Sequence, residues 1–264
     1  MPKVGSLWTG RIPFEDTELA VSDSGGSGTP VIYLNGQFAT QAYWKRVISG
    51  LGVDDWRHIT FDERARGRSK SSCDYSFDAA LRDVDAVLSG RGIVATDKVL
   101  VVGWSYGAYV AAHWASQNPD RCLGAVFVDG AFPYDWLDED MERRIRKLFR
   151  QLNWFMPLLR PTGLVPRMTG EQQANSNIEL GVVSSNANFL PVLDRISVPA
   201  LYVVASGVSF GSRGNEQELC RNSTKVVCAR NSNIHVSTKV ASDHGAVLKK
   251  DFAAVVNAVR QIAS

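Results

Sequence analysis

A strand, a sharp turn and a helix follow one another without a break in residues 99–115, VLVVGWSYGAYVAAHWA. Four aliphatic residues lead into GWSYG at 103–107, and small residues at helical spacing come next. A tight strand-to-helix turn brings the flanking residues close to the serine backbone, so side chains at Gly103 and Gly107 would clash. The pattern therefore predicts that Ser105 is exposed at a helix N-terminus, where negative charge is stabilised.

A dinucleotide-binding loop is the main competing interpretation of a glycine-rich turn after a buried strand. That loop requires the spacing GxGxxG, with a glycine where this chain has Ser105. The competing motif fails at its central glycine, which leaves the GxSxG nucleophile turn as the interpretation that fits.

Strand-like runs recur along the chain with helical patterns between them, such as Phe77–Leu88 and Ala108–Ser116. Strands joined through helices pair in parallel, so we expect the second half of the sheet to be parallel and covered on both faces. The early strands are separated only by turn-rich SDSGGSGTP, which favours antiparallel pairing. The seven runs interpreted as strands are Glu18–Val21, Pro30–Leu34, His58–Phe61, Val99–Val102, Gly124–Val128, Ala200–Val204 and Asn233–Val240.

The region from about residue 132 to residue 194 breaks this alternation and contains no convincing strand. It carries WLDEDMERRIRKLFRQLNWFMPLL, in which the apolar residues fall on one helical face and basic residues face the other way. Such a helix could pack its apolar stripe on the domain beneath, lie on a membrane or bind an acidic partner; we expect the first. The stripe consists of Met141, Ile145, Leu148, Phe149, Leu152 and Met156, and the basic residues are Arg143, Arg144, Lys147 and Arg150.

Composition limits the partners of the chain. With 264 residues and a formal net charge of +2, it has no broad basic character for nucleic acid, so we expect a small-molecule partner. The chain begins without the apolar segment of a signal peptide and has no run long enough for a bilayer, so we expect a cytoplasmic protein without a membrane span. The cysteines and histidines lack CxxC, HxxxH and HExxH spacing, so we expect no metal site. The oligomeric state stays open.

Several segments together resemble the α/β-hydrolase superfamily, in particular its small bacterial members with a serine nucleophile and a lid between strands six and seven. GWSYG and the C-terminal DHG are the most specific of these segments, and the resemblance covers nearly the whole chain. The segments are YLNGQFATQAYW (33–44), FDERARGRS (61–69), GWSYG (103–107), FVDGAF (127–132) and ASDHGAVLKKD (241–251).

The resemblance implies an α/β fold with a mostly parallel, doubly wound, eight-stranded sheet and a small helical cap. It implies a core formed by residues 1–131 and 195–264, with residues 132–194 inserted as the cap.

A serine hydroxyl needs a base to take its proton. We assign that base to His244, which follows the last predicted strand and lies downstream of Ser105, as the chain order of this fold requires. We expect ordinary structural roles for the other three histidines, His58, His113 and His235.

The acid that orients the base is expected at an unusual place. In most relatives it follows the seventh strand, but residues 200–214 contain no carboxylate and Glu216 is the first one beyond them. Asp129, at the end of the sixth strand, occupies the position that some relatives use, and we favour it over a purely turn-forming role before Gly130.

Two backbone N–H groups are expected to bind the oxyanion of a tetrahedral intermediate. Tyr106, which follows the nucleophile, supplies one. The second is expected from the loop NGQF, where Asn35 replaces the histidine that is usual in the family. Gln37 is our choice for this donor, with Phe38 as the alternative.

A serine nucleophile points to acyl transfer through an acyl-enzyme on Ser105, without a cofactor. Relatives that open epoxides or remove halide use aspartate at this position, which disfavours those activities. Hydrolysis of a moderately hydrophobic ester or lactone is the preferred prediction. Thioester, amide and carbon–carbon bond hydrolysis, or ligand binding without catalysis, stay open. The residues expected to line an aromatic pocket are Phe38, Trp104, Phe132, Trp136 and Trp154.

Overall fold

The computed structural model describes residues 6–153, 165–208 and 214–264. Eight strands form one sheet in the order β1-β2-β4-β3-β5-β6-β7-β8. The pairs β1–β2 and β2–β4 are antiparallel, and every other pair is parallel, so the parallel second half of the sheet is as predicted. The expected antiparallel pairing across SDSGGSGTP is wrong, because β4 lies between β2 and β3 in the sheet. The strands are β1 Trp8–Phe14, β2 Thr17–Asp23, β3 Thr29–Leu34, β4 Trp56–Phe61, β5 Val99–Trp104, β6 Cys122–Val128, β7 Ala200–Ala205 and β8 Ile234–Val240.

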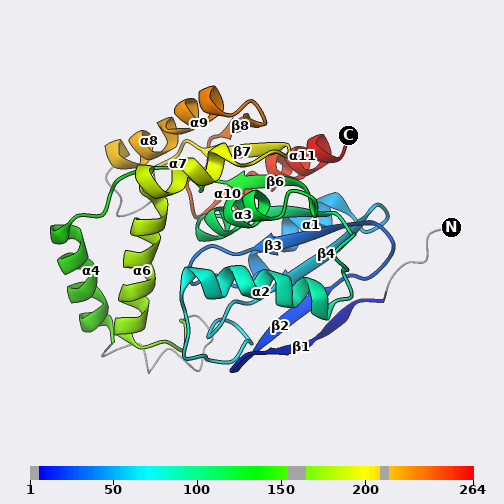
Figure 1. Cartoon of the computed structure of the whole chain (residues 1–264), viewed down its shortest axis with the longest axis horizontal. Coiled ribbons are helices and arrows are strands. Elements are labelled where there is room, and N and C mark those ends of the chain that lie inside the picture. The colour runs from blue at the N-terminus through cyan, green and yellow to red at the C-terminus, as the bar shows by residue number, and fades with distance from the viewer. Residues whose placement is uncertain (1–5, 154–164, 209–213) are drawn as a thin grey trace.

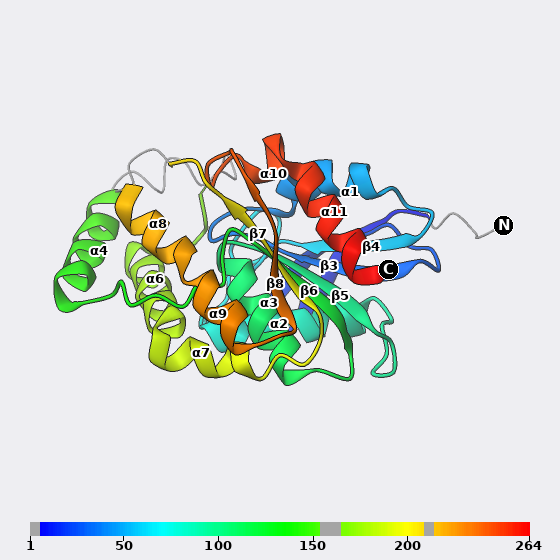
Figure 2. The same cartoon turned by 90° about the horizontal axis from the view of Figure 1, so that it is seen from above.

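Helices cover both faces of the sheet (Figure 1). Viewed from above, α1, α10 and α11 lie on one side of the strands and α2, α3 and α7 on the other (Figure 2). The described helices are α1 Lys45–Leu51, α2 Phe77–Gly90, α3 Tyr106–Gln117, α4 Glu139–Leu152, α6 Gly170–Ser184, α7 Asn186–Asp194, α8 Gly214–Asn222, α9 Thr224–Arg230, α10 Val247–Lys250 and α11 Phe252–Ala263, with a 3₁₀ turn at Gln41–Trp44.

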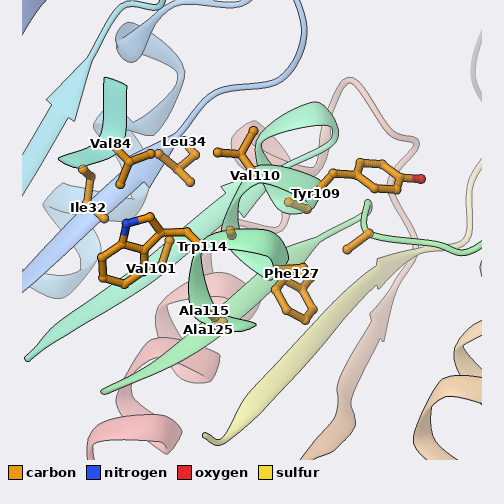
Figure 3. Close-up of a cluster of buried hydrophobic side chains, with 14 of the residues drawn as sticks. Ile32, Leu34, Val84, Val101, Tyr109, Val110, Trp114, Ala115, Ala125 and Phe127 are labelled. Carbon is orange, nitrogen blue, oxygen red and sulfur yellow. The ribbon is translucent and has the colours of Figure 1, made fainter. Parts of the chain in front are cut away.

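The alternation of side chains along each strand divides the core into two layers. On β5, Val101 faces the layer under α2 and α3, whereas Leu100 and Val102 face the layer under α1 and α11. Figure 3 shows the first layer, in which Trp114 of α3 and Val84 of α2 pack against strand residues. Because both faces are covered, β5 and its neighbours are continuous apolar runs, which is why they were recognisable in the sequence.

Strand β1 was not among the seven runs identified in the sequence. Its residues WTGRIPF alternate between half-buried and exposed, and it pairs only with β2 at the edge of the sheet. Gly10 and Pro13 interrupt the apolar pattern of this edge strand, so its own sequence gives a weak strand signal. It is recognised as a strand through its pairing with β2.

Three described helices, α4, α6 and α7, lie between β6 and β7. Side-chain caps start two of them: Asp138 accepts from the N–H of Met141 on α4, and Thr169 forms a capping box with Gln172 on α6. Figure 1 shows α4 and α6 side by side at one end of the molecule, where they pack against each other.

The predicted amphipathic helix is present as α4, but its apolar stripe is only partly covered. Phe149 is buried, whereas Leu148 and Leu152 are 51% and 36% exposed. The reason is that α4 packs mainly on α6, one helix away from the sheet, so only one side of the stripe meets a partner. Met156 lies outside the described residues. Within the described residues, no helix has the length and apolar character to cross a membrane.

Candidate active site

The turn between β5 and α3 holds Ser105 in a backbone conformation that few side chains adopt, with φ 55° and ψ −117°. The Ser105 N–H donates to the carbonyl of Val128 at the end of β6, 3.0 Å away. A built Cβ on Gly103 would lie 2.1 Å from the Gly107 carbonyl oxygen, and one on Gly107 would lie 2.2 Å from that of Leu34. Only glycine fits at both positions, so the turn raises Ser105 above the sheet at the start of α3.

Ser105, His244 and Asp129 form a continuous hydrogen-bonded chain. His244 Nε2 lies 2.9 Å from Ser105 Oγ, and His244 Nδ1 lies 2.8 Å from Asp129 Oδ2. With its proton on Nδ1, the neutral ring donates to the carboxylate and accepts from the serine hydroxyl. These residues follow β5, β6 and β8, so the carboxyl ends of the strands bring together positions that are up to 139 residues apart in the chain.

The Asp129 carboxylate is almost completely buried and fully hydrogen-bonded. Besides His244, it accepts from the Ala205 N–H at 3.0 Å and from Arg221 Nε and Nη2, both at 3.1 Å. Burial works to raise the pKa of Asp129, but the hydrogen bonds from His244 and Arg221 outweigh it and hold the pKa below its ordinary value. Asp129 is therefore a carboxylate, able to stabilise a protonated ring on His244.

Two further carboxylates near this site are Glu216, on α8, and Asp243, beside His244. Glu216 is exposed on α8. Asp243, next to His244 in the chain, accepts from the N–H of Ala246 and so caps the following turn.

Of the remaining histidines, His58 and His113 pack within the fold, whereas His235 is exposed. His58 lies 2.8 Å from the hydroxyl of Tyr33 and 2.6 Å from the carbonyl of Gly52. The ring of His113 stacks on Phe189, with 5.6 Å between the centroids. His235 lies on β8, at the edge of the sheet.

The loop after β3 is anchored through Asn35. This side chain is fully buried; its Nδ2 donates to Phe61 O and Glu63, and its Oδ1 accepts from Trp44. The side-chain amide of Asn35 therefore anchors this loop, at the position where relatives usually have a histidine. Gln37 follows in the same loop, and its side chain donates to Ser176 of α6 at 3.4 Å.

Gln37 and Tyr106 line one small cavity beside the turn that holds Ser105. Tyr106 is the first residue of α3, where the first N–H groups of a helix have no partner within the helix. The role of the Gln37 N–H as the second oxyanion donor stays a prediction.

A larger cavity of about 240 Å³ opens directly over the three hydrogen-bonded residues. Phe132 and Trp136 from the loop after β6 are in its wall, as expected from the sequence. The wall also contains residues that the sequence did not indicate, namely Tyr109, Leu180, Gln217, Cys220 and Arg221. The site thus has an apolar and aromatic wall, with one guanidinium against the carboxylate.

Three other aromatic residues predicted for the pocket have different placements. The Phe38 ring packs on Phe149 of α4, with 6.1 Å between the centroids. Trp104 is buried and donates from Nε1 to the carbonyl of His244 at 3.2 Å, so it supports the loop that carries His244. Neither residue lines the cavity over Ser105. Trp154 lies outside the described residues.

Across the described ranges, no three histidine, cysteine, aspartate or glutamate side chains converge in a way that could hold a metal ion. All four cysteines are free thiols.

Comparison with known proteins matches residues 29–159 to the family described as the alpha/beta hydrolase fold. A haloalkane dehalogenase from Mesorhizobium japonicum is 30% identical over 144 residues, which cover 54% of this chain and 45% of that protein. The chain thus aligns with less than half the length of the first curated relatives that it matches.

Solved structures resemble the chain over nearly its whole length. A thermophilic esterase from Thermogutta terrifontis superposes with a TM-score of 0.73 and 19% identity, covering 97% of this chain and 100% of that one. The enol-lactonase from Burkholderia xenovorans LB400 gives a TM-score of 0.67 and 15% identity, covering 94% and 96%. At such identities the likeness concerns the fold. The match to the family model, in agreement with the eight-stranded sheet, shows that the chain belongs to the α/β-hydrolase superfamily.

Proposed function

We propose that this protein is a serine hydrolase that cleaves carboxylic esters or lactones of moderately hydrophobic small molecules. The observation that carries the proposal is the hydrogen-bonded chain from Ser105 through His244 to Asp129, below an apolar cavity. Such a chain activates a hydroxyl that is otherwise a weak nucleophile.

The proposed reaction begins when His244 Nε2 takes the proton of Ser105 and the Oγ atom attacks the substrate carbonyl carbon. The N–H groups of Tyr106 and Gln37 bind the oxyanion that forms. The tetrahedral intermediate collapses, the bond to the alcohol oxygen breaks, and His244 returns the proton to that oxygen. Water then attacks the acyl-serine with His244 as base again, which releases the acid and restores Ser105. Asp129 stays ionised and faces the protonated ring in both halves.

The nucleophile disfavours the reaction of the dehalogenase relative. If the oxygen of Ser105 displaced a halide from an alkyl carbon, the product would be an ether. An ether has no carbonyl carbon for water to attack, so the enzyme would be consumed in one turnover. Acyl transfer leaves an ester on the serine, which water can hydrolyse.

We also propose that residues 132–194 act as a cap around residues 1–131 and 195–264. Trp136 and Leu180 from this segment line the cavity over Ser105, so they are placed to contact the substrate. Phe132, Tyr109 and Cys220 complete an apolar wall, which favours hydrophobic acyl or alkyl groups.

The test is a panel of p-nitrophenyl esters of increasing acyl length together with γ- and δ-lactones. It is run on the wild type and on Ser105→Ala. We expect turnover that favours apolar groups of moderate size and falls by about 10⁵-fold in Ser105→Ala, because the whole triad acts through that oxygen. Retained turnover in Ser105→Ala, or turnover of short, charged acyl groups alone, would contradict the proposal.

A further inference from the structure

The proposed acid and base follow two strands that are not adjacent in the sheet. Asp129 follows β6 and His244 follows β8, and β7 lies between these two strands in the sheet. The carboxylate must therefore reach past the end of β7 to meet the imidazole. Its backbone N–H donates to Val203 O of β7 at 2.8 Å, and Ala205, the last residue of β7, donates to Oδ1. The β7 backbone thus fixes one carboxylate oxygen.

Arg221 of α8 fixes the same carboxylate from the other side. Its Nε and Nη2 donate to Oδ1 and Oδ2 of Asp129, both at 3.1 Å, in a two-pronged arrangement. Its Nη1 donates to the carbonyl of Gly207, in the loop after β7, at 2.9 Å. The Arg221 side chain is 11% exposed and that of Asp129 is 2% exposed, so solvent screens this pair weakly.

We infer that Arg221 is a positioning residue of this site: its guanidinium keeps the Asp129 carboxylate ionised and turned toward His244. The inference rests on the proposed function, because it assigns Arg221 a part in orienting the base of that reaction. Arg221 acts through Asp129 and is not itself expected to exchange a proton, since guanidinium stays charged in proteins.

The fixed positive charge has a further consequence for the pH dependence of the site. A cation beside Asp129 opposes protonation of the coupled Asp129–His244 pair. Replacing Arg221 by a neutral residue removes this opposition, so the pair takes up its proton at a higher pH. Because the site is active only when this proton is absent, the acidic limb of the activity profile moves upward.

Two other titratable groups face the pair among the described residues. Burial raises the pKa of Cys220 on α8 to about 12 and raises the pKa of Tyr109 on α3 well above its ordinary value. Both groups therefore stay neutral across the range in which the pair changes its protonation state, and the charge that shifts the limb is that of Arg221.

The experiment compares Arg221→Gln and Arg221→Lys with the wild type. For each protein, kcat and KM are recorded against pH with one ester of the panel, and the rate of Ser105 labelling by a fluorophosphonate is recorded over the same range. For Arg221→Gln we expect kcat to fall by about 10- to 100-fold with KM little changed, because a small misplacement of the base is costly. We expect the acidic midpoint of both profiles to rise by about one pH unit.

Arg221→Lys separates charge from geometry. Lysine keeps the positive charge but presents a point donor that cannot grip two carboxylate oxygens in a fork. We expect the acidic midpoint to stay at the wild-type value while kcat falls. This variant also keeps the inference testable if Arg221→Gln does not fold, because a wild-type kcat in a folded Arg221→Lys would overturn it.

Arg57→Gln is the matched control. Arg57 grips the buried carboxylate of Asp23 with the same two-pronged geometry, through Nε at 3.1 Å and Nη2 at 2.7 Å, near the start of β4 and away from the carboxyl ends of the strands. Arg91 also holds Asp23, so the carboxylate keeps a partner in this variant. We expect the control to keep the wild-type profile. A wild-type kcat and midpoint in Arg221→Gln, or an equal shift in Arg57→Gln, would overturn the inference.

The result for Ser105→Ala separates a failure of the proposed function from a failure of the role assigned to Arg221. If Ser105→Ala turns over substrate and is labelled like the wild type, the proposed function fails. If Ser105→Ala is inert while Arg221→Gln matches the wild type, the proposed function stands and the assignment of Arg221 alone fails.

Discussion

Ser105 has φ 55° and Asp129 has φ 41°, backbone conformations that glycine adopts readily and other residues rarely do. Ala131, two residues beyond Asp129, has φ 58°. Each such residue costs on the order of 1–3 kcal/mol unless its surroundings impose the conformation. Here the surroundings are tight, since a Cβ on Gly130 would lie 2.4 Å from the Ser105 carbonyl oxygen. Three of the six described non-glycine residues with positive φ thus lie around Ser105 and Asp129, and the other three are Glu15, Phe38 and Ala65.

Glu63, which supports the loop of Asn35, gives a prediction for stability at the residue scale. Burial raises the pKa of Glu63 from 4.5 to about 7, against the attraction of Arg66 and the hydrogen bond from Asn35. The folded state therefore holds this proton more tightly than the unfolded chain. The stabilisation is complete below pH 4.5 and is lost as the pH rises through 7. Relative to Glu63→Gln, the wild type should lose about 2 kcal/mol of unfolding free energy between pH 5 and pH 8.

Urea unfolding at the two pH values measures this difference. Glu139→Gln serves as the control, because it makes the same chemical change at a side chain that is 94% exposed. If the unfolding free energies of the wild type and Glu63→Gln change by the same amount between pH 5 and pH 8, the Glu63 carboxyl does not titrate in this range and the prediction is wrong.

The sequence could indicate Ser105 and His244 as the candidate nucleophile and base, but not every residue around them. Ser105 and His244 stand in local patterns, GWSYG and DHG, whose neighbours restrict the backbone directly. Asp129 could be proposed as the acid because residues 200–214, where most relatives carry that acid, contain no carboxylate. Arg221 could not be found, because its partner Asp129 is 92 residues away and nothing in NEQELCRN marks one arginine of an exposed helix as turned inward.

At the scale of elements, the segment between β6 and β7 shapes the candidate pocket. Trp136 lines the cavity over Ser105 and is held by a hydrogen bond from Nε1 to Ser184 of α6 at 2.9 Å. The periodicity of α4 indicated a helix, but it could not indicate what the helix packs on. Its partner α6 has only a weak apolar pattern of its own. The sequence therefore could not indicate that α4 packs on α6 and leaves Leu148 exposed.

This arrangement predicts that Trp136 sets acyl specificity. In Trp136→Ala we expect kcat/KM for a long acyl ester to fall by about tenfold while that for the acetate changes less, because only the long chain loses an apolar contact. The control is Leu148→Ala, whose side chain is 51% exposed on α4 and outside the cavity wall. The measurement is steady-state kinetics on these two esters. If the ratio of kcat/KM for the long ester to kcat/KM for the acetate is unchanged in Trp136→Ala, the acyl chain binds elsewhere.

At the scale of the whole molecule, the parallel strands gather the site from distant parts of the chain. The order β5-β6-β7-β8 places Ser105, Asp129 and His244 at the carboxyl ends of β5, β6 and β8, on the same edge of the sheet. The central parallel strands β3, β5, β6 and β7 were predictable, because they are mostly buried and have long apolar runs. The edge strand β1 and the order of the strands were not, since these depend on pairing between segments rather than on local pattern.

The most direct test of the account is whether Ser105 is an activated nucleophile in the folded protein. The purified chain is treated with a fluorophosphonate, its intact mass is measured, and the modified peptide is mapped, with Ser105→Ala and protein unfolded beforehand as controls. We predict one adduct, on Ser105, that both controls lack, because the hydroxyl reacts only when His244 takes its proton and the oxyanion is bound. A folded protein that forms no adduct, or forms it on another residue, would contradict the assignment of the site.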